Sequence, residues 1–265
     1  MSSDRPTCCQ LCHSPGPFQA RYTALSEKGE KRSFLECRCG FVFRDPPPTR
    51  KELEEFYQKL WKKDKTERPG LEKSVTTSYR FLNQFSRYTK PGRFLDVGCG
   101  RGFYLMAAQE RGWDSYGVDL ISNENDAHGI HFFKGTLQEA RFTSEFFNAC
   151  LVSHTLSHLL EPLETLREIY RILMPGGILC AVIPNFLRLG RSGLCRKGDT
   201  LLAEQHLYLF TRETAQQFVR EVGLTLFEAE EGLIRKIARP KEFLKTLLRK
   251  VLPGPAIVLW ARKGS

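Results

Sequence analysis

Hydrophobic and polar positions follow two alternating patterns through the last two thirds of the chain. Short apolar runs typical of buried strands are separated by stretches in which apolar residues recur every three or four positions, as on one face of a helix. The pattern predicts strands at 93–97, 114–119, 130–133, 147–153, 177–183, 224–230 and 255–262. The predicted helices between them include 102–111, 162–173 and 211–222. Strands alternating with helices indicate an α/β fold with a seven-stranded, mostly parallel sheet and helices on both faces.

The first part of the chain follows a different pattern, with short aromatic runs that predict small β-hairpins. Consecutive prolines at 46–48 then form a stiff boundary, because they disfavour both helix and sheet. Thr49 and Glu52 form a capping box for a helix whose apolar residues recur at helical spacing, and a second helix is expected at about 72–88. We therefore expect a cysteine-rich module at 1–45, a linker with helices at 46–92 and an α/β domain at 93–265.

Composition supports a globular chain and leaves the partner open. Apolar residues make up 41% of the 265 residues, which is enough for a buried core. The net charge is +10, and the basic stretches at 59–68 and 235–250 are more typical of solvated helix faces than of a nucleic-acid site. No apolar run is long enough to span a bilayer and no signal-like segment stands at the N-terminus, so a cytoplasmic location is expected. The basic, apolar segment 233–251 is expected to cover the sheet or a ligand site, although a membrane surface or a partner would also suit it.

The most informative segment is a glycine-rich loop between a predicted strand and a predicted helix, with the sequence Asp96-Val97-Gly98-Cys99-Gly100-Arg101-Gly102. A dinucleotide site would place its third glycine one residue later. Asp96 is also unfavourable beside a pyrophosphate, because both are negatively charged. The loop therefore favours a ligand with a cationic end and no phosphates.

This loop resembles the first motif of the class I, Rossmann-like S-adenosylmethionine-dependent methyltransferases. The family also carries an acid at the end of the second strand, which takes the ribose hydroxyls, and Asp119 occupies that place. The Pro-Gly-Gly turn at 175–177 is similar to the family's turn into its fifth strand. The resemblance implies that S-adenosylmethionine is bound by Asp96, Gly98, Cys99, Gly100, Gly102, Asp119, Leu120, Thr136, Leu137, Ser153 and His154. Thr136, Asn148 and Ser157 depart from acidic residues that the family often has at these places.

The N-terminal cysteines have a spacing close to that of a zinc ribbon. Cys9 and Cys12 form a Cys-x2-Cys pair, and Cys37 and Cys39 follow with one residue fewer between them. Tetrahedral zinc is bound by four thiolates from two such knuckles, and a module of this size needs the metal to compensate for its small core. We expect structural zinc on these four residues, with Cys8 or His13 as a substitute ligand and a metal-free module as the alternative.

Two histidines are candidates for the chemistry of methyl transfer, because imidazole accepts a proton near neutral pH. His206 lies in a His-Leu-x-x-Phe-Thr segment that resembles the acceptor side of related enzymes, and His158 follows the fourth predicted strand. The whole chain resembles a group often linked to O-methylation of a small-molecule or saccharide hydroxyl. Two alternatives remain open: an RNA methyltransferase that uses the ribbon and the basic helices, and a non-catalytic binding module that kept the fold.

Overall fold

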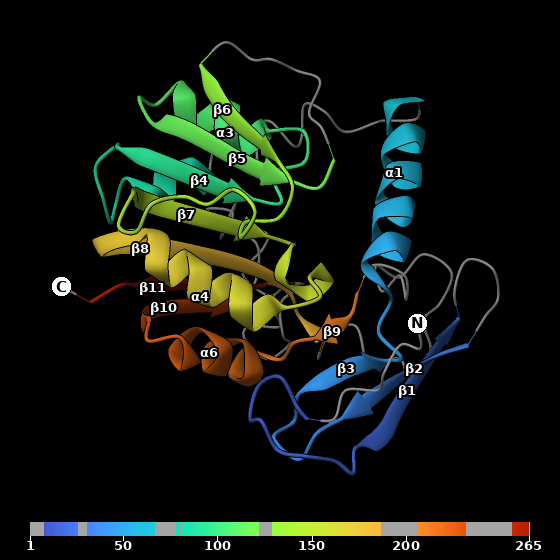
Figure 1. Cartoon of the computed structure of the whole chain (residues 1–265). Helices are drawn as coiled ribbons and strands as arrows, with labels where there is room; N and C mark the ends of the chain where they lie inside the picture. The colour runs from blue at the N-terminus through green and yellow to red at the C-terminus, as the bar shows by residue number, and fades with distance from the viewer. Residues whose placement is uncertain are drawn as a thin grey trace, which may run out of the picture.

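The computed structural model of the chain describes residues 8–25, 31–66, 78–79, 81–121, 129–186, 206–231 and 256–264. Figure 1 shows a large twisted sheet with helices packed on it, a smaller sheet built by the N-terminal residues, and the long helix α1 (Arg50–Thr66) standing beside the large sheet. All strands in the described part of the chain belong to one of these two sheets.

The large sheet has seven strands in the order β10-β11-β8-β7-β4-β5-β6. Their bounds are β4 (Arg93–Val97), β5 (Asp114–Asp119), β6 (Ile130–Lys134), β7 (Phe147–Ser153), β8 (Leu173–Pro184), β10 (Thr225–Glu231) and β11 (Ala256–Arg262). Strands β6, β5, β4, β7 and β8 pair in parallel, whereas β11 is antiparallel to both β8 and β10. This confirms the predicted seven-stranded, mostly parallel sheet. The chain order reverses between β4 and β7, where sheets of this type bind ligands at the carboxyl ends of their strands.

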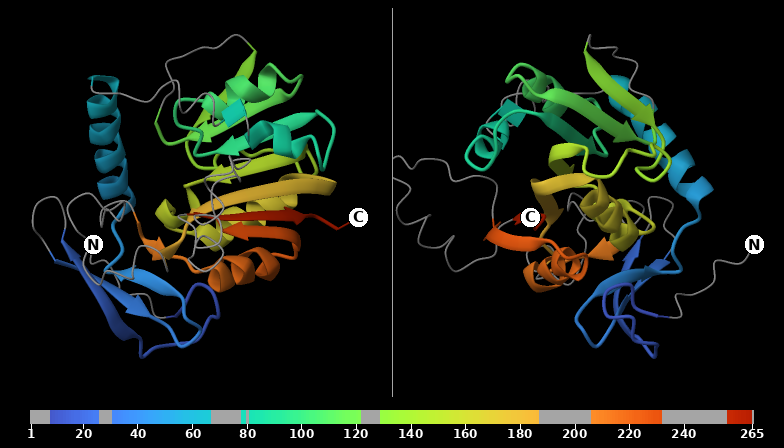
Figure 2. Two further views of the ribbon diagram at one scale, coloured as in Figure 1. Left: turned by 180° about the vertical axis from the view of Figure 1, so that it is seen from behind. Right: turned by 60° about the vertical axis from the view of Figure 1, so that its left-hand side comes forward.

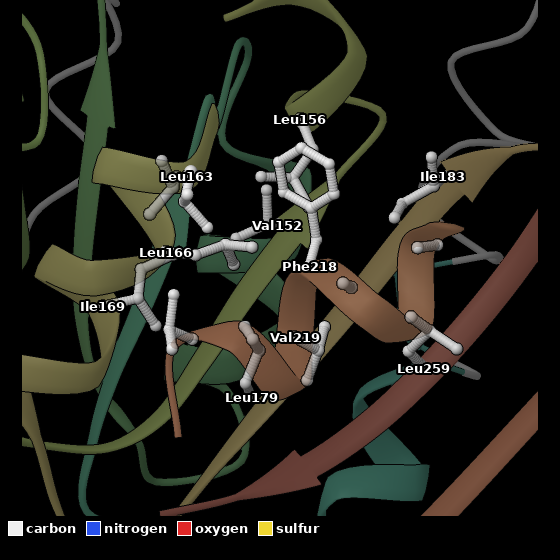
Figure 3. Close-up of a cluster of buried hydrophobic side chains, with 14 of the residues drawn as sticks. Val152, Leu156, Leu163, Leu166, Ile169, Leu179, Ile183, Phe218, Val219 and Leu259 are labelled. Atoms are coloured by element: carbon white, nitrogen blue, oxygen red, sulfur yellow. The ribbon is translucent and has the colours of Figure 1, made fainter. Parts of the chain in front are cut away.

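Helices cover both faces of this sheet, as the sequence predicted. Side chains alternate along each strand, so that one face packs against α4 (Pro162–Ile172) and α6 (Arg212–Glu221). Figure 3 shows this core, with Leu166 and Ile169 of α4 and Phe218 of α6 over Val152 and Leu179 of the strands. The opposite face packs against α3 (Phe103–Gln109) and the helical residues 81–85.

A second sheet connects the N-terminal residues to the segment after β8. Its strands are β1 (Gln19–Leu25), β2 (Lys31–Glu36), β3 (Val42–Asp45) and β9 (Tyr208–Leu209), in that order. The pair β3–β9 is antiparallel and joins the predicted cysteine-rich module to a strand that follows it far along the sequence (Figure 1). The backbone N–H of Arg44 extends the pairing by donating to the carbonyl oxygen of Leu207, 2.8 Å away.

The start of strand β8 differs from the sequence prediction. Strand β8 begins at Leu173 rather than at 177, because the Pro-Gly-Gly segment continues the strand through a bulge opposite β7. Gly176 has a φ of 75° in this bulge, and its N–H donates to the carbonyl oxygen of Lys263. Along α1, Leu53 is buried but Leu60 is 38% exposed, so the apolar side of this helix is only partly covered by described residues.

Some expectations lie outside the described residues, namely the basic segment 233–251 and residues 72–77 and 80 of the predicted helix 72–88. The described part of this helix is helical at 78–79 and 81–85. Among the described residues, no helix combines the length and the apolar character that crossing a membrane requires.

Candidate active site and cysteine cluster

The glycine loop directly follows β4, at the carboxyl edge of the sheet. Gly98, Gly100 and Gly102 have φ values of 74°, 52° and 75°, in the left-handed region that glycine adopts readily. A Cβ at Gly98 would lie 2.3 Å from the hydroxyl oxygen of Thr155, so a side chain is excluded there. A Cβ at Gly100 would meet no described atom within 4 Å, so the loop faces open space at this position. A ligand can therefore approach the backbone of the loop at Gly100.

Asp119, at the end of β5, is hydrogen-bonded to this loop. Its Oδ2 accepts from the backbone N–H of Gly100 at 2.8 Å, and its Oδ1 accepts from the N–H of Ile121 at 3.0 Å. Burial raises the pKa of Asp119, while these backbone hydrogen bonds oppose the rise. Each carboxylate oxygen retains a further lone pair, so the group can accept from two neighbouring hydroxyls of a ribose.

Asp96, on β4, is a buried carboxyl group. It is 1% exposed, and its Oδ2 has no hydrogen-bond partner among the described residues. Burial and the negative charge of Asp119 raise the pKa of Asp96 to about 8. An unpaired buried carboxylate is costly unless a cation approaches it, so this group fits the ammonium and sulfonium of S-adenosylmethionine.

The other residues expected at the cofactor lie at the same edge of the sheet, in different surroundings. Cys99 is buried, and a Cβ at Gly117 would lie 2.8 Å from its sulfur. Ser153 ends β7 and hydrogen-bonds to Tyr104 of α3. His154 follows in the left-handed region, with a φ of 56°, and its N–H donates to the carbonyl oxygen of Val182.

The segment after β6 and the residue that directly follows β5 contain the remaining residues expected at the cofactor. Thr136 and Glu139 form a reciprocal pair: the N–H of Thr136 donates to the Glu139 carboxylate, and the N–H of Glu139 donates to the Thr136 hydroxyl. Leu137 is buried, and Leu120, directly after β5, is half-buried. Arg50 of α1 also pairs with Glu139 at 2.9 Å, so α1 is attached to this segment.

The two candidate catalytic histidines lie together beside this edge. The ring centroids of His158 and His206 are 4.8 Å apart, with the rings nearly perpendicular. His206 is 5% exposed, and the Nε2 atom of His158 is buried without a hydrogen-bond partner among described residues. Burial, with smaller effects of His206 and His154, lowers the pKa of His158 to about 3, so its imidazole is neutral at physiological pH.

Tyr57 of α1 belongs to the same cluster, and sequence reasoning missed it. Its hydroxyl oxygen lies 2.9 Å from Nδ1 of His158, and the two rings are stacked with centroids 6.3 Å apart. Burial and the nearby charge of Asp119 raise the pKa of Tyr57. Helical periodicity marked Tyr57 as part of an apolar face, but nothing in the pattern indicates which distant residue its hydroxyl contacts.

Leu207, which precedes β9, and Tyr208, which begins it, both bond to the segment that carries His158. The N–H of Leu207 donates to the carbonyl oxygen of Ser157 at 2.8 Å, and the Tyr208 hydroxyl donates to the carbonyl oxygen of Leu160, also at 2.8 Å. These two bonds bracket His158 in its short 3-10 turn η1 (Leu156–His158). The segment that carries His206 is therefore held against the segment that carries His158.

The four expected metal ligands lie close together in the N-terminal unit, by which we mean the described residues 8–25 and 31–45 that carry β1, β2 and β3. The sulfur atoms of Cys9, Cys12, Cys37 and Cys39 all lie within 4.8 Å of one another. The Cys9–Cys39 and Cys12–Cys37 sulfur distances are 3.7 and 3.5 Å. With Zn–S bonds of about 2.3 Å, a tetrahedral site has sulfur atoms about 3.8 Å apart. The cluster thus has the size that zinc requires.

The surrounding backbone supports the same interpretation. The N–H of Leu11 donates to the sulfur of Cys9, and the N–H of Gly40 donates to the carbonyl oxygen of Cys37 in a tight turn. Burial raises the pKa of the Cys9 thiol, and it raises that of Cys39 to about 11. A divalent cation would reverse this preference, because it stabilises the thiolates. The cluster is compatible with structural zinc.

The chain is similar to known methyltransferases. The model of a family described as a methyltransferase domain matches residues 49–229, more than half of the chain. A demethylmenaquinone methyltransferase of Listeria welshimeri is 29% identical over 109 residues, which are 36% of this chain and 46% of the relative. The chain thus spans about half the length of this curated relative.

Solved structures show the same fold. A 1,6-didemethyltoxoflavin-N1-methyltransferase of Burkholderia thailandensis, with bound 1,6-didemethyltoxoflavin and S-adenosylhomocysteine, has a TM-score of 0.60 at 15% identity. The match covers 92% of this chain and 100% of that one. A complex of the Haloferax volcanii Trm112 methyltransferase activator with a methyltransferase matches 72% of this chain and 91% of that chain, with a TM-score of 0.55 and 16% identity. The family match over residues 49–229 shows that the chain belongs to the methyltransferase domain family, and the solved structures show that it has the fold of these methyltransferases.

Proposed function

We propose that this enzyme transfers the methyl group of S-adenosylmethionine to a hydroxyl of a small molecule or saccharide. The observation that carries the proposal is the pair of histidines beside the glycine loop, His158 and His206. A hydroxyl gives up its proton when its oxygen is methylated, so a neutral imidazole next to the acceptor suits this reaction. Membership of the family favours an enzyme over a non-catalytic binding module.

The roles of the cofactor residues form part of this proposal. Asp119 accepts from the ribose hydroxyls, Asp96 faces the cationic end, and the backbone of Gly98, Gly100 and Gly102 allows close approach. Cys99, Leu120, Thr136, Leu137, Ser153 and His154 complete the surroundings of the cofactor. When bound, the cofactor supplies an electrophilic methyl group on a sulfonium. His206 is the proposed base that takes the hydroxyl proton as the acceptor oxygen bonds to this methyl group.

A small acceptor is supported by two considerations. The same fold holds 1,6-didemethyltoxoflavin in the Burkholderia enzyme, so it accommodates a compact acceptor next to the cofactor. The buried position of His206 and His158 also suits a ligand that can enter between side chains better than a folded RNA.

The test is methyl transfer from isotopically labelled S-adenosylmethionine to a panel of phenols, sugars and amines, with total RNA as a separate acceptor. The expected result is labelling of one or more hydroxyl compounds that falls at least a hundredfold in His206→Ala. Thr165→Ala, at a buried position of α4 outside the histidine cluster, is the control variant. Labelling of RNA, with salt-sensitive RNA binding, would instead favour an RNA methyltransferase.

A further inference from the structure

Tyr57 reaches the histidine cluster from helix α1, which lies outside the large sheet (Figure 2). Its hydroxyl contacts Nδ1 of His158 at 2.9 Å, and the planes of the two rings differ by 21°. A hydrogen atom must lie between these two atoms, and it belongs either to the phenol or to the imidazole. Which of them carries it determines what the other nitrogen of His158 can do.

The surroundings assign this hydrogen to the phenol. Burial and the negative charge of Asp119 raise the pKa of Tyr57, so its hydroxyl keeps its proton. A phenol O–H is a strong donor but its oxygen is a weak acceptor, because a lone pair is delocalised into the ring, whereas an imidazole nitrogen is a strong acceptor. Tyr57 therefore donates and Nδ1 of His158 accepts.

The single proton of the neutral His158 ring then lies on Nε2. Burial, with smaller effects of His206 and His154, lowers the pKa of His158 to about 3, which leaves one ring proton at neutral pH. The buried Nε2 atom has no hydrogen-bond partner among the described residues. A buried N–H without an acceptor is energetically unfavourable, so a ligand oxygen that accepts from it would bind favourably.

We propose that Tyr57 is a positioning residue that fixes His158 in its Nε2–H tautomer, so that His158 donates a hydrogen bond to a lone pair of the methyl-acceptor oxygen. This inference rests on the proposed function and refines it. His158 orients the acceptor and His206 remains the base, so the two histidines have different roles. The donor also selects the acceptor class, because a hydroxyl or phenol oxygen offers a lone pair and a protonated amine does not.

The tautomer can be measured directly by long-range ¹H–¹⁵N correlation NMR on protein with ¹⁵N-labelled histidine and bound S-adenosylhomocysteine at neutral pH. The His158 signals are assigned by their loss in His158→Gln. The expected spectrum has the proton of His158 on Nε2 and an accepting Nδ1. In Tyr57→Phe, which removes only the hydroxyl, the expected spectrum is a mixture of both tautomers.

The matched control is Tyr116→Phe. Tyr116 also stacks on a histidine, His131, with ring centroids 4.4 Å apart, but its hydroxyl bonds to Asp114. This variant should leave the His158 signals unchanged. A proton on Nδ1 in the unmodified protein, or an unchanged His158 spectrum in Tyr57→Phe, would overturn the proposal.

Kinetics separate this inference from the proposed function. Tyr57→Phe should lower kcat/KM for the hydroxyl acceptor about tenfold, mainly through a higher KM, whereas His206→Ala should lower kcat. Absence of transfer to every hydroxyl in the panel counts against the proposed function, while the tautomer is still read from the spectrum. A fall in kcat alone in Tyr57→Phe would contradict the positioning role.

Discussion

The ring of Phe41 stacks on the ring of Tyr208, with centroids 5.4 Å apart and an angle of 13° between the planes. Phe41 belongs to the N-terminal unit and directly precedes β3, whereas Tyr208 begins β9, two residues after the candidate base His206. Phe41 is fully buried and also contacts Phe210 and Phe218. This ring therefore joins the cysteine-bearing unit to the core of the methyltransferase domain.

Replacing Phe41 should destabilise the whole protein. Removal of a buried phenylalanine ring costs about 3–5 kcal/mol, and Phe41→Ala should lower Tm by roughly 6 to 20 °C for a chain of this size. Phe227→Ala is the control, because Phe227 is 42% exposed and should cost much less. Thermal unfolding followed by circular dichroism measures both variants. Equal shifts in the two would contradict a joining role for Phe41.

Asp119→Ala should weaken cofactor binding. Loss of the two hydrogen bonds that we propose the carboxylate accepts from the ribose hydroxyls, at about 1.5–3 kcal/mol each, should raise Kd for S-adenosylhomocysteine at least about a hundredfold. Asp114→Ala is the matched control at the other end of β5, since Asp114 is half exposed and pairs with His131. Titration calorimetry gives both constants. Similar affinity of the two variants would remove Asp119 from the site.

Affinity for S-adenosylmethionine should rise with pH below the pKa of Asp96. This pKa is raised to about 8 by burial and by Asp119, so at pH 6 the carboxyl group is protonated and must lose its proton to face a cation. Where the group is mostly protonated, affinity should increase up to about tenfold per pH unit. Calorimetry between pH 6 and 7.5, in buffers of different ionisation enthalpy, measures both the affinity and the proton released.

The raised pKa of Asp96 also makes the stability of the ligand-free protein depend on pH. Its pKa is higher in the folded chain than the ordinary value of 3.8, so the ligand-free protein loses stability as pH rises from that value to about 8. Asp96→Asn should remove this pH dependence and should also weaken cofactor binding. A cofactor affinity that is flat from pH 6 to 7.5 in the unmodified enzyme would show that Asp96 is already ionised.

Metal analysis should find one zinc per chain, lost in Cys37→Ser. The four sulfur atoms lie within 4.8 Å of one another, and removal of one leaves an incomplete tetrahedron. Cys8→Ser is the matched control, because Cys8 is exposed and does not belong to the cluster. Zinc content by mass spectrometry and Tm before and after chelation are the measurements. Full zinc content in Cys37→Ser would point to a different ligand set.

The sequence predicted the large sheet well, because its strands carry strong local signals. Buried runs such as that ending in Asp96-Val97 are continuous and bounded by glycine or polar residues, and periodicity detects both features. The carboxyl ends of adjacent parallel strands must meet at one edge, so Asp96 and Asp119 could be placed together from their positions alone.

The contacts between distant segments could not be predicted. Strand β9 has two residues, which is too short for an alternating pattern, and its partner β3 lies in the N-terminal unit. The Tyr57–His158 contact likewise depends on where α1 packs, which the helix's own periodicity does not determine. Asn148 stands where the resembled family often has an acidic residue. The structure explains it locally, because the Oδ1 atom of Asn148 accepts from the N–H of Arg93 at the start of β4.

The pairing of β3 with β9 also bears on how the chain matures during synthesis. Val42 and Phe43 leave the ribosome long before their partners Leu209 and Tyr208, by a delay on the order of ten seconds at ordinary translation rates. During this interval β3 has an unpaired edge and an uncovered apolar surface, which are the features that recruit chaperones or promote aggregation. Early metal binding by the cysteines would reduce the number of conformations that the nascent segment can adopt. Its sheet is nevertheless completed only after most of the α/β domain has been synthesised.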